Sequence, residues 1–470
     1  MKERMLKSYS PPILQVVFLI IVIFQYYVNI GLSEQYTTIL ALEMMAIYAW
    51  ILTKSLKRWG LFDIYSLLLC TVGLFTYGEI VFSFFDADVD FRIASIGEVL
   101  TFNENTIQKA MLIYSAFMLS LDFGMNCFRK DKEEIVENIV TFNRDIYNVG
   151  KTLLILFAAF AFYRAFVQYQ LLNANRLLLF KGGSEGLGLP LYLRITSTFF
   201  LIGYYIFTAS KPPMKQFLWV TVVYILIQIP DLMVGNRMAL GVLFLYVIWM
   251  MVSVYGYNIN TKKLVIPIIA LVLVFQYIGM SRVGMETSGI STISFLINFL
   301  TMQATSFGLL CTYIQYTPYI SGPYPFVLDS LIGGLTGYTG QTETTLEHRA
   351  SIGHQLVYEV CPDYYFAGQS SGTCFVTELY EFGIAGVIFG SFLFAYMIYF
   401  YQKNFSHSRG LLLFSYIVFT IFVTSPRAGM FVPLYQIIRT LAFVWIAFKV
   451  YKFVTGKSVN VLSWFKGLKL

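Results

Sequence analysis

Long apolar segments follow one another along most of the chain, and they constrain its fold more than any other feature. A helix needs roughly 20 consecutive apolar residues to cross a bilayer. Hydrophobic residues make up 57% of the 470 residues and charged residues only 13%, a balance that soluble domains do not sustain. The sequence therefore predicts an all-α, polytopic integral membrane protein with about twelve transmembrane helices, near residues 12–32, 36–54, 61–84, 107–127, 149–168, 190–210, 216–234, 238–256, 263–281, 376–401, 410–425 and 429–451.

The distribution of lysine and arginine in the short connections predicts the orientation of these helices. Every second connection is basic: MKERMLK, KSLKRW, FRKDKEE, KPPMK, NTKK and QKNFSHSR. The connections between them include the acidic stretch DADVDFRIASIGEVLTFNENT. Because basic loops stay on the cytoplasmic side of a membrane, we expect both termini to be cytoplasmic.

One long segment, residues 282–375, interrupts the series and divides the chain into three parts. Residues 1–281 form an N-terminal block of about nine spans, and residues 376–470 form a C-terminal block of about three spans with a cytoplasmic tail. The charge pattern places 282–375 on the extracytoplasmic side of the membrane as a long loop. Within it, ISTISFLINFLTMQATSFGLLCTYIQY is apolar but carries polar residues, which favours an interfacial or re-entrant helix over a thirteenth span.

Arginines at the outer ends of the predicted spans are the most informative polar residues. An arginine in a membrane span is costly and usually faces a cavity or a partner. Because guanidinium binds phosphate through two parallel hydrogen bonds, several of them on one face predict a cationic pocket for a phosphate or pyrophosphate group. For each residue alone, the alternative is a side chain that extends to the lipid headgroups. The arginines in question are Arg164, Arg194, Arg237, Arg282 and Arg427.

Arg439 lies in the middle of the last predicted span. A charge at that depth needs a partner, and we expect a carboxylate such as Glu43, Glu79 or Asp122.

The polar half of the long loop supplies the candidates for acid–base chemistry. His348 and His354 are two of the three histidines in the chain, and they flank Arg349, a further candidate phosphate ligand. A loop histidine or glutamate can accept the proton of a reacting hydroxyl; the alternative for each is a surface hydrogen-bonding role. The carboxylates that compete for this role are Glu343 and Glu359, with Glu347, Asp363 and Glu378 behind them.

Metal and cofactor sites are not predicted. The two loop histidines are six residues apart and fall on different faces of a helix, and neither an HExxH motif nor a ligand cluster is present. Cys361 and Cys374 lie on the same predicted outer side. They either form a disulfide bond in an oxidising compartment or remain free thiols, and the sequence favours neither.

Several outer motifs together resemble a known family. They are GNR in a short turn between two spans, SR at the end of the next span, the long loop, the segment GTCFVTELYEFGIAGVIFGSF, and the last outer turn Ser425-Pro426-Arg427. This arrangement is similar to that of the Wzy-type polymerases, which build O-antigen, enterobacterial common antigen or capsular polysaccharide from lipid-linked repeat units.

The resemblance implies a metal-independent, GT-C-like glycosyltransferase of the bacterial inner (plasma) membrane, with its active site on the extracytoplasmic face. Its substrates would be undecaprenyl-pyrophosphate-linked glycans: the growing glycan moves to the non-reducing end of an incoming lipid-linked repeat unit, and undecaprenyl pyrophosphate is released. The related O-antigen ligases use two outer arginines and a loop histidine, which Arg237, Arg282 and His348 or His354 match by position.

Two other functions remain open at this stage. One is an O-antigen-type ligase that uses the same donor with another acceptor. The other is a flippase or transporter of lipid-linked oligosaccharides, although such proteins are commonly built from two similar halves, which this chain lacks. A chain-length regulator is a candidate protein partner, and no nucleic-acid partner is predicted.

Overall fold

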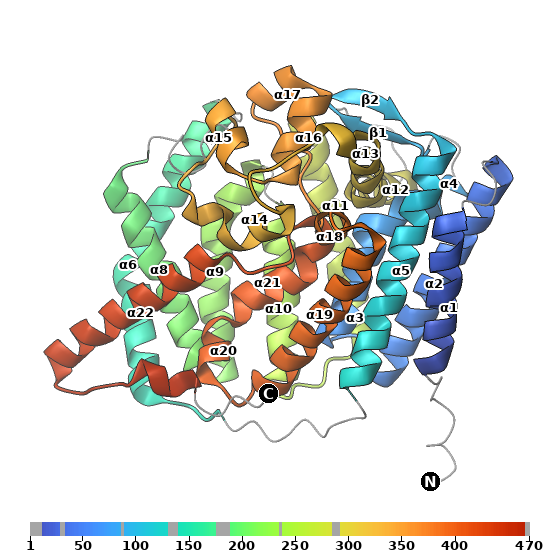
Figure 1. Cartoon of the computed structure of the whole chain (residues 1–470). Helices are drawn as coiled ribbons and strands as arrows, with labels where there is room; N and C mark the ends of the chain where they lie inside the picture. Colours follow the sequence, from blue (N-terminus) through green and yellow to red (C-terminus); the bar gives the residue numbers. More distant parts are fainter. Residues whose placement is uncertain are drawn as a thin grey trace, which may run out of the picture.

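The computed structural model describes residues 12–28, 33–85, 89–129, 140–174, 189–234, 237–283 and 292–465, which form a mainly helical bundle (Figure 1). Its first part contains α1 (Pro12–Val28), α2 (Glu34–Arg58), α3 (Ile64–Val72), a π-helical turn η1 (Gly73–Tyr77), α4 (Gly78–Ser83), α5 (Glu104–Phe128), α6 (Arg144–Ala174), α8 (Leu191–Ala209), α9 (Met214–Val234), α10 (Arg237–Ser253) and α11 (Thr261–Val283).

The second part begins with short helices and ends with longer ones. The short helices are α12 (Thr292–Gln303), α13 (Ser306–Tyr316), η3 (Thr317–Tyr319), α14 (Phe326–Ile332), η4 (Gly333–Leu335), α15 (Glu343–His348), α16 (Ile352–Val360), α17 (Pro362–Phe366) and α18 (Phe375–Tyr380). They are followed by α19 (Gly383–Asn404), α20 (Arg409–Leu413), α21 (Ser415–Thr424), η5 (Ser425–Arg427), α22 (Leu434–Thr455) and η6 (Val461–Phe465).

Six helical segments of the described part are long and apolar enough to cross a membrane. They are Glu34–Arg58, Ile64–Ser83, Glu104–Phe128, Arg144–Leu171, Leu191–Ala209 and Gly383–Asn404. Shorter apolar helices include Ile13–Val28, Met214–Pro230 and Arg237–Ser253. The prediction of an all-α membrane protein is therefore confirmed, while the count of twelve spans and the GT-C-like fold stay predictions.

Short polar residues begin two of the long helices. The side chain of Ser33 accepts a hydrogen bond from the Tyr36 amide at the start of α2, and Asn103 does the same for Thr106 at the start of α5. Such caps satisfy amide groups that have no partner within the helix. Lys57 and Arg58 end α2, where positive charge complements the helix dipole.

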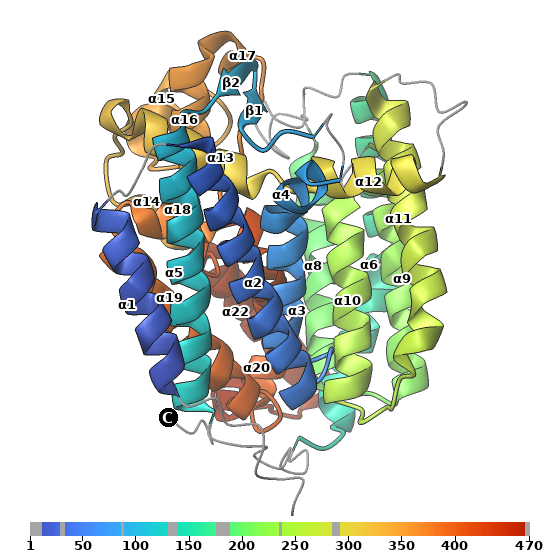
Figure 2. The same ribbon diagram turned by 90° about the vertical axis from the view of Figure 1, so that its right-hand side faces the viewer.

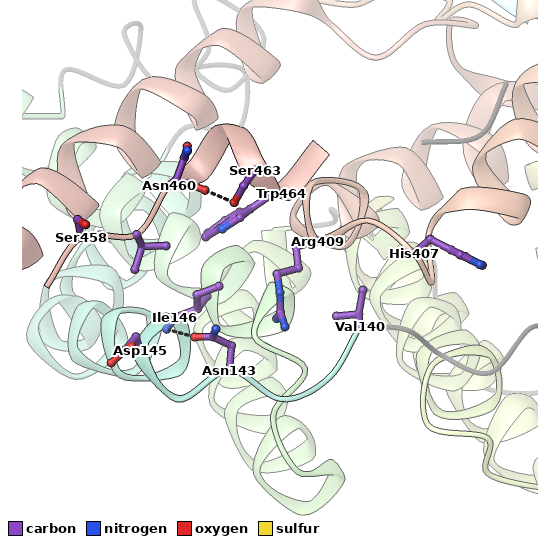
Figure 3. A pocket seen from close by; sticks show the side chains of 11 residues that line it. Val140, Asn143, Asp145, Ile146, His407, Arg409, Ser458, Asn460, Ser463 and Trp464 are labelled. Atoms are coloured by element: carbon purple, nitrogen blue, oxygen red, sulfur yellow. Dashed lines mark hydrogen bonds between the residues drawn. The ribbon is translucent and has the colours of Figure 1, made fainter. Parts of the chain in front are cut away.

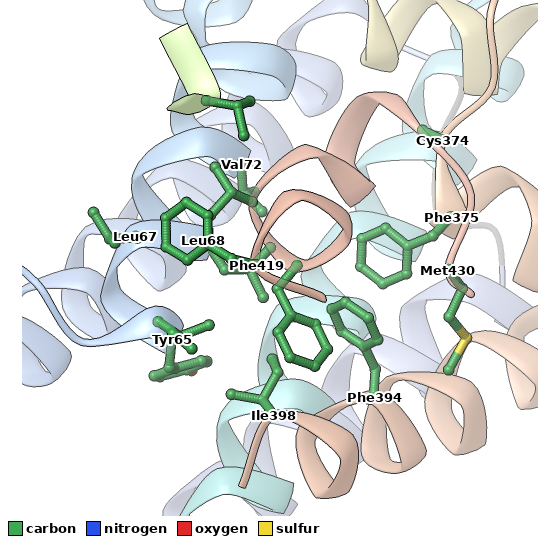
Figure 4. Packing of buried hydrophobic residues seen from close by; sticks show 14 of the residues in the cluster. Tyr65, Leu67, Leu68, Val72, Cys374, Phe375, Phe394, Ile398, Phe419 and Met430 are labelled. Atoms are coloured by element: carbon green, nitrogen blue, oxygen red, sulfur yellow. The ribbon is translucent and has the colours of Figure 1, made fainter. Parts of the chain in front are cut away.

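Close packing between helices relies on aromatic side chains in some places and on glycine in others. Figure 4 shows the aromatic kind, where Tyr65 of α3, Phe375 of α18, Phe394 of α19 and Phe419 of α21 lie in one buried cluster. Between α6 and α8 the backbones approach closely instead: a Cβ atom added at Gly150 would lie 2.6 Å from the backbone nitrogen of Phe207. Small residues allow such approaches in membrane proteins.

The short helices α13–α18, residues 306–380, form a cap over one end of the bundle, with α15, α16 and α17 outermost at the top of Figure 1 and α14 and α18 deeper, beside the long helices. A two-stranded antiparallel hairpin, β1 (Ile93–Ile96) and β2 (Glu98–Thr101), lies beside the cap. Its turn residue Gly97 has φ +78° and approaches Tyr364 of α17 so closely that an added Cβ would lie 2.9 Å from the tyrosine Cβ. This hairpin, which was not predicted from the sequence, ties the cap to the connection between α4 and α5.

Helix α12 is 12 residues long and lies across the capped ends of α10 and α11 (Figure 2). The expected span at 376–401 corresponds to two helices, because α18 belongs to the cap and the membrane-length helix α19 starts only at Gly383.

The charged pair inside the bundle differs from the expected one. Asp122 of α5 is fully buried, and Lys54 of α2 lies 2.8 Å from its carboxylate. Arg439 of α22 instead lies over the ring of Tyr435, with 5.7 Å between the guanidinium carbon and the ring centroid. The expected pairing of Arg439 with Glu43, Glu79 or Asp122 is therefore wrong, since among the described residues Arg439 makes no ion pair with any of the three. Asp122 in particular is distant, because α22 and α5 lie on different sides of the bundle (Figure 1).

Candidate functional site

A cavity of about 470 Å³ at the capped end brings together two of the predicted arginines. We call it cavity A. Arg237 reaches it from the first turn of α10, and Arg427 from η5, the turn that follows α21. The other lining residues are Thr71, Leu74, Phe75, Met238, Gly241, Val242, Phe244, Leu245, Ile268, Leu271, Val272, Phe275, Phe299, Gln303, Val423 and Thr424.

Neutral groups hold the two guanidinium groups in place. Arg237 donates a hydrogen bond of 2.9 Å to the backbone carbonyl of Phe275 in α11. Arg427 donates one of 2.8 Å to the amide oxygen of Gln303 in α12, and it lies 5.8 Å from the centroid of the Phe75 ring. Among the described residues, no carboxylate makes an ion pair with Arg427.

The electrostatics of cavity A favour an anion. Burial, together with the positive charge of Arg237, lowers the pKa of Arg427 below its usual value. The guanidinium remains protonated at neutral pH, so the lowered pKa reflects first the cost of burying this charge and second its proximity to the charge of Arg237. A bound phosphate group would remove this cost by accepting hydrogen bonds from both guanidinium groups.

Apart from its arginines, Gln303 and two threonines, cavity A has apolar walls. They come from η1, α10, α11, α12 and α21. A cationic site with such walls suits an amphipathic anion, a ligand with a phosphorylated head and a hydrocarbon tail. The side chain of Arg282, the third arginine expected here, lies outside the described residues.

The structure places the remaining outer arginines elsewhere. Arg194 lines a second cavity, together with Arg164 and Arg439. Arg349 makes a bidentate ion pair with Asp329 of α14, with N–O distances of 2.8 and 3.2 Å, and Tyr324 donates a hydrogen bond to the same carboxylate. Asp329 was not predicted as a functional residue, because an acidic residue in a short apolar helix belongs to no recognisable motif.

The two loop histidines have different surroundings. His348 is exposed at the end of α15, where its ring stacks on Tyr338 at a centroid distance of 4.3 Å. His354 in α16 is partly enclosed, and its Nδ1 lies 3.5 Å from the hydroxyl of Tyr365. Burial, and after it the charge of Arg349, lowers the pKa of His354 to about 4. His354 is therefore neutral at neutral pH.

Among the candidate carboxylates, Glu343 and Glu359 are exposed on the cap, whereas Glu378 of α18 is only 3% exposed. The Glu378 carboxylate accepts hydrogen bonds from the Thr373 hydroxyl (3.2 Å) and the Met430 amide (3.3 Å). It therefore joins the cap to the turn that carries Arg427. Burial raises the pKa of Glu378 to about 8.

Cys361 and Cys374 are free thiols in the structure. Cys374 is buried against Thr377 and Tyr114, and Cys361 lies near the hairpin turn at Gly97. The disulfide considered from the sequence is therefore not formed.

A third cavity, of about 400 Å³, is shown from close by in Figure 3. It lies beside α20, at the end of the bundle opposite the cap (Figure 1). It is formed by the start of α6, the connection between α19 and α20, and η6. Arg409 donates a hydrogen bond to the carbonyl of Thr141, and Asp145 accepts one from Tyr451. These polar residues thus hold neighbouring segments together.

The helical bundle, its cap and a cavity at the capped end that combines two arginines with apolar walls together define a polytopic membrane protein. The sequence model of the O-antigen polysaccharide polymerase Wzy family matches residues 12–455. The chain belongs to this family, which confirms the resemblance inferred from the outer motifs. It is accordingly a multi-pass membrane protein of polysaccharide biosynthesis, a glycosyltransferase-type O-antigen polymerase. No match was found among curated proteins or solved structures.

Proposed function

We propose that the protein polymerises oligosaccharide repeat units carried on undecaprenyl pyrophosphate, and that cavity A holds the pyrophosphate of the donor. The observation that carries this proposal is the combination of Arg237 and Arg427 with apolar walls in one cavity. The guanidinium groups would bind the pyrophosphate, and the apolar walls would contact the first part of the polyprenyl chain.

In the proposed reaction a hydroxyl oxygen of the incoming repeat unit attacks the anomeric carbon of the growing glycan. A new glycosidic bond forms, and the bond between the anomeric carbon and the pyrophosphate oxygen breaks. The pyrophosphate leaves with the electron pair, so negative charge develops next to Arg237 and Arg427. Hydrogen-bond donors that are already in position stabilise such charge without any reorganisation of the protein during the reaction.

The proton of the attacking hydroxyl needs an acceptor, and we propose His354 for this role. At neutral pH its unprotonated ring presents a nitrogen lone pair, and with a pKa of about 4 it takes the proton only as the new bond to the anomeric carbon makes the hydroxyl strongly acidic. It lies within the cap rather than on its exposed face. Binding of the acceptor between the cap and the bundle would bring the hydroxyl to this ring. His348, Glu343 and Glu359 remain exposed alternatives from the same segment.

The test of cavity A is complementation of a strain that makes the cognate repeat unit but lacks its own polymerase. The readout is the ladder of surface glycan on a gel, at equal levels of each membrane protein. Wild type is expected to restore the ladder. Arg237→Ala and Arg427→Ala are expected to leave mostly single repeats, because the loss of one hydrogen-bond donor to the developing negative charge lowers the rate by about 10²–10³-fold. Arg92→Ala is the matched control, since Arg92 lies near the hairpin and pairs with Glu34 outside cavity A. Normal ladders from both cavity variants would overturn the proposal.

The role of His354 is tested in the same strain by His354→Ala, with His348→Ala as the control on the same cap. Removal of a general base lowers rates by about 10²–10⁴. The His354 variant is therefore expected to give single repeats and the His348 variant a ladder. The reverse result would assign the proton acceptor to His348.

A further inference from the structure

A second arginine-lined cavity, of about 460 Å³, lies between α6, α8, α9 and α22. We call it cavity B. Arg164 comes from α6, Arg194 from α8 and Arg439 from α22, so three separate helices each contribute one guanidinium group. The other lining residues are Ala161, Ala165, Gln168, Ser197, Thr198, Phe200, Leu201, Tyr224, Ile227 and Gln228.

Cavity B is separate from cavity A but lies toward the same end of the bundle. Arg194 is in the first turn of α8, and Arg439 is in the second turn of α22. Helix α22 starts shortly after η5, the turn that carries Arg427, and α14 and η4 of the cap contact α22. The two cavities share no described lining residue and no lining helix. The outer arginines that the sequence suggested as one pocket are thus divided between two.

The charges around cavity B favour an anionic ligand. All three ionised side chains among its described lining residues are positive, and none of those residues is acidic. Gln168, Gln228, Ser197 and Thr198 add neutral hydrogen-bonding groups. An arginine among membrane helices is costly, and three around one cavity repel one another. A phosphate group can accept hydrogen bonds from several guanidinium groups at once.

Extension of these arginines to the membrane surface does not account for the geometry of Arg164. This residue lies well inside the 31-residue helix α6, and its guanidinium donates a hydrogen bond of 2.9 Å to the hydroxyl of Ser197 on α8. It therefore points across to the neighbouring helix, into cavity B. The volume of the cavity falls within the range of about 300–1,000 Å³ that is usual for ligand sites.

We propose that cavity B binds the pyrophosphate of the second lipid-linked substrate, the acceptor repeat unit. This inference rests on the proposed function, in which donor and acceptor each carry a lipid pyrophosphate. Only the donor pyrophosphate leaves, and its charge changes during the reaction. The acceptor pyrophosphate keeps its bond to sugar, so cavity B contributes equally to binding of the ground state and of the transition state. Removal of its arginines raises the KM for the acceptor and leaves kcat unchanged.

The direct test measures how many lipid pyrophosphates each chain binds. The full-length protein is placed in nanodiscs of phosphatidylcholine and titrated with sugar-free undecaprenyl pyrophosphate, and bound lipid is counted by native mass spectrometry. Wild type is expected to bind two molecules. Arg439→Gln and Arg164→Gln should each weaken one site by about 10- to 100-fold, the usual value of a hydrogen bond to a charged group. Arg237→Gln should weaken the other site, and Arg92→Gln should retain both.

The outcomes separate the two proposals. Suppose that the Arg237 variant loses one site and both cavity B variants still bind two molecules. This result would overturn the proposal of an acceptor site in cavity B and leave the donor site in cavity A intact. If instead the cavity B variants lose one site and the Arg237 variant still binds two molecules, cavity A is refuted as the donor site. Thermal unfolding of each variant identifies a folding defect, and the use of two cavity B variants keeps the test available if one of them misfolds.

Two further arms identify the source of the phosphate group. Inorganic pyrophosphate and phosphatidylglycerol are each titrated as competitors of undecaprenyl pyrophosphate. Displacement from cavity B by phosphatidylglycerol at equal concentration would make it a general phospholipid site and overturn the proposal. Displacement by inorganic pyrophosphate only at much higher concentration is the expected result, because the free anion lacks the contacts of the polyprenyl chain.

Discussion

Replacing Glu378 by glutamine is expected to remove a loss of stability that wild type suffers as pH rises. The Glu378 carboxyl is buried between Thr373 and Met430, and burial raises its pKa from 4.5 to about 8. Between these two values the folded protein binds more protons at this site than the unfolded chain does. Folded stability therefore falls as pH rises from about 4.5 to 8.

The size of the effect follows from the shift. One pKa unit corresponds to about 1.4 kcal/mol, so the shift from 4.5 to about 8 corresponds to about 5 kcal/mol between acidic and basic pH. Glutamine has nearly the same shape as the protonated acid but does not titrate. Its oxygen can accept the hydrogen bond from the Met430 amide, and its NH2 group can donate one to the Thr373 hydroxyl. The difference in unfolding free energy between Glu378→Gln and wild type should therefore grow in favour of the variant across this range.

The assay is denaturant-induced unfolding of the purified protein in detergent at pH 5, 6, 7, 8 and 9. Glu347→Gln, which removes an exposed carboxylate on the same cap, controls for the change in net charge. Parallel stability curves for wild type and Glu378→Gln would refute the reasoning, because they would mean that the carboxyl titrates alike in the folded and unfolded states.

Three further results are expected. Gly150→Ala should destabilise the protein by about 1–3 kcal/mol, because the new methyl group would meet the backbone of Phe207. Gly241→Ala is the control and should leave stability unchanged, because the nearest atom to its new methyl group would be in the Phe275 ring, at 3.4 Å. Equal thermal unfolding of the two variants would contradict this prediction. Because the folded-state pKa of His354 is about 4 against 6.5, stability should fall as pH drops from 6.5 to 4, and His354→Asn should abolish that part of the fall in a pH series of melting curves. Arg349→Met should cost about 3–5 kcal/mol by leaving the Asp329 carboxylate without its partner, and adding Asp329→Asn should recover part of the loss.

The sequence predicts the membrane class and the importance of the outer arginines because both depend on simple patterns. Helix length and hydropathy follow from the bilayer, and the alternation of basic connections places Arg237 and Arg427 at the same end although they are far apart in sequence. Both are found in cavity A. The family follows from short motifs at these same turns.

Other parts of the site depend on tertiary packing and leave no local pattern. Gln303 is an ordinary polar residue in an amphipathic segment until α12 lies over cavity A and brings it to Arg427. Asp329 becomes important only through its ion pair with Arg349. The division of the arginines into two cavities likewise depends on which helices are neighbours, and hydropathy alone does not specify that.

The order in which cavity A acquires its walls has a consequence for synthesis of the protein. Its lining residues begin at Thr71 in α3 and end at Arg427 in η5, so the cavity combines early, middle and late parts of the chain. A ribosome-bound chain that has not yet released η5 already has the apolar walls and Arg237, but it lacks the second guanidinium group. Lipid-linked precursors would therefore meet a cavity with both cations only after nearly all of the membrane helices have been made.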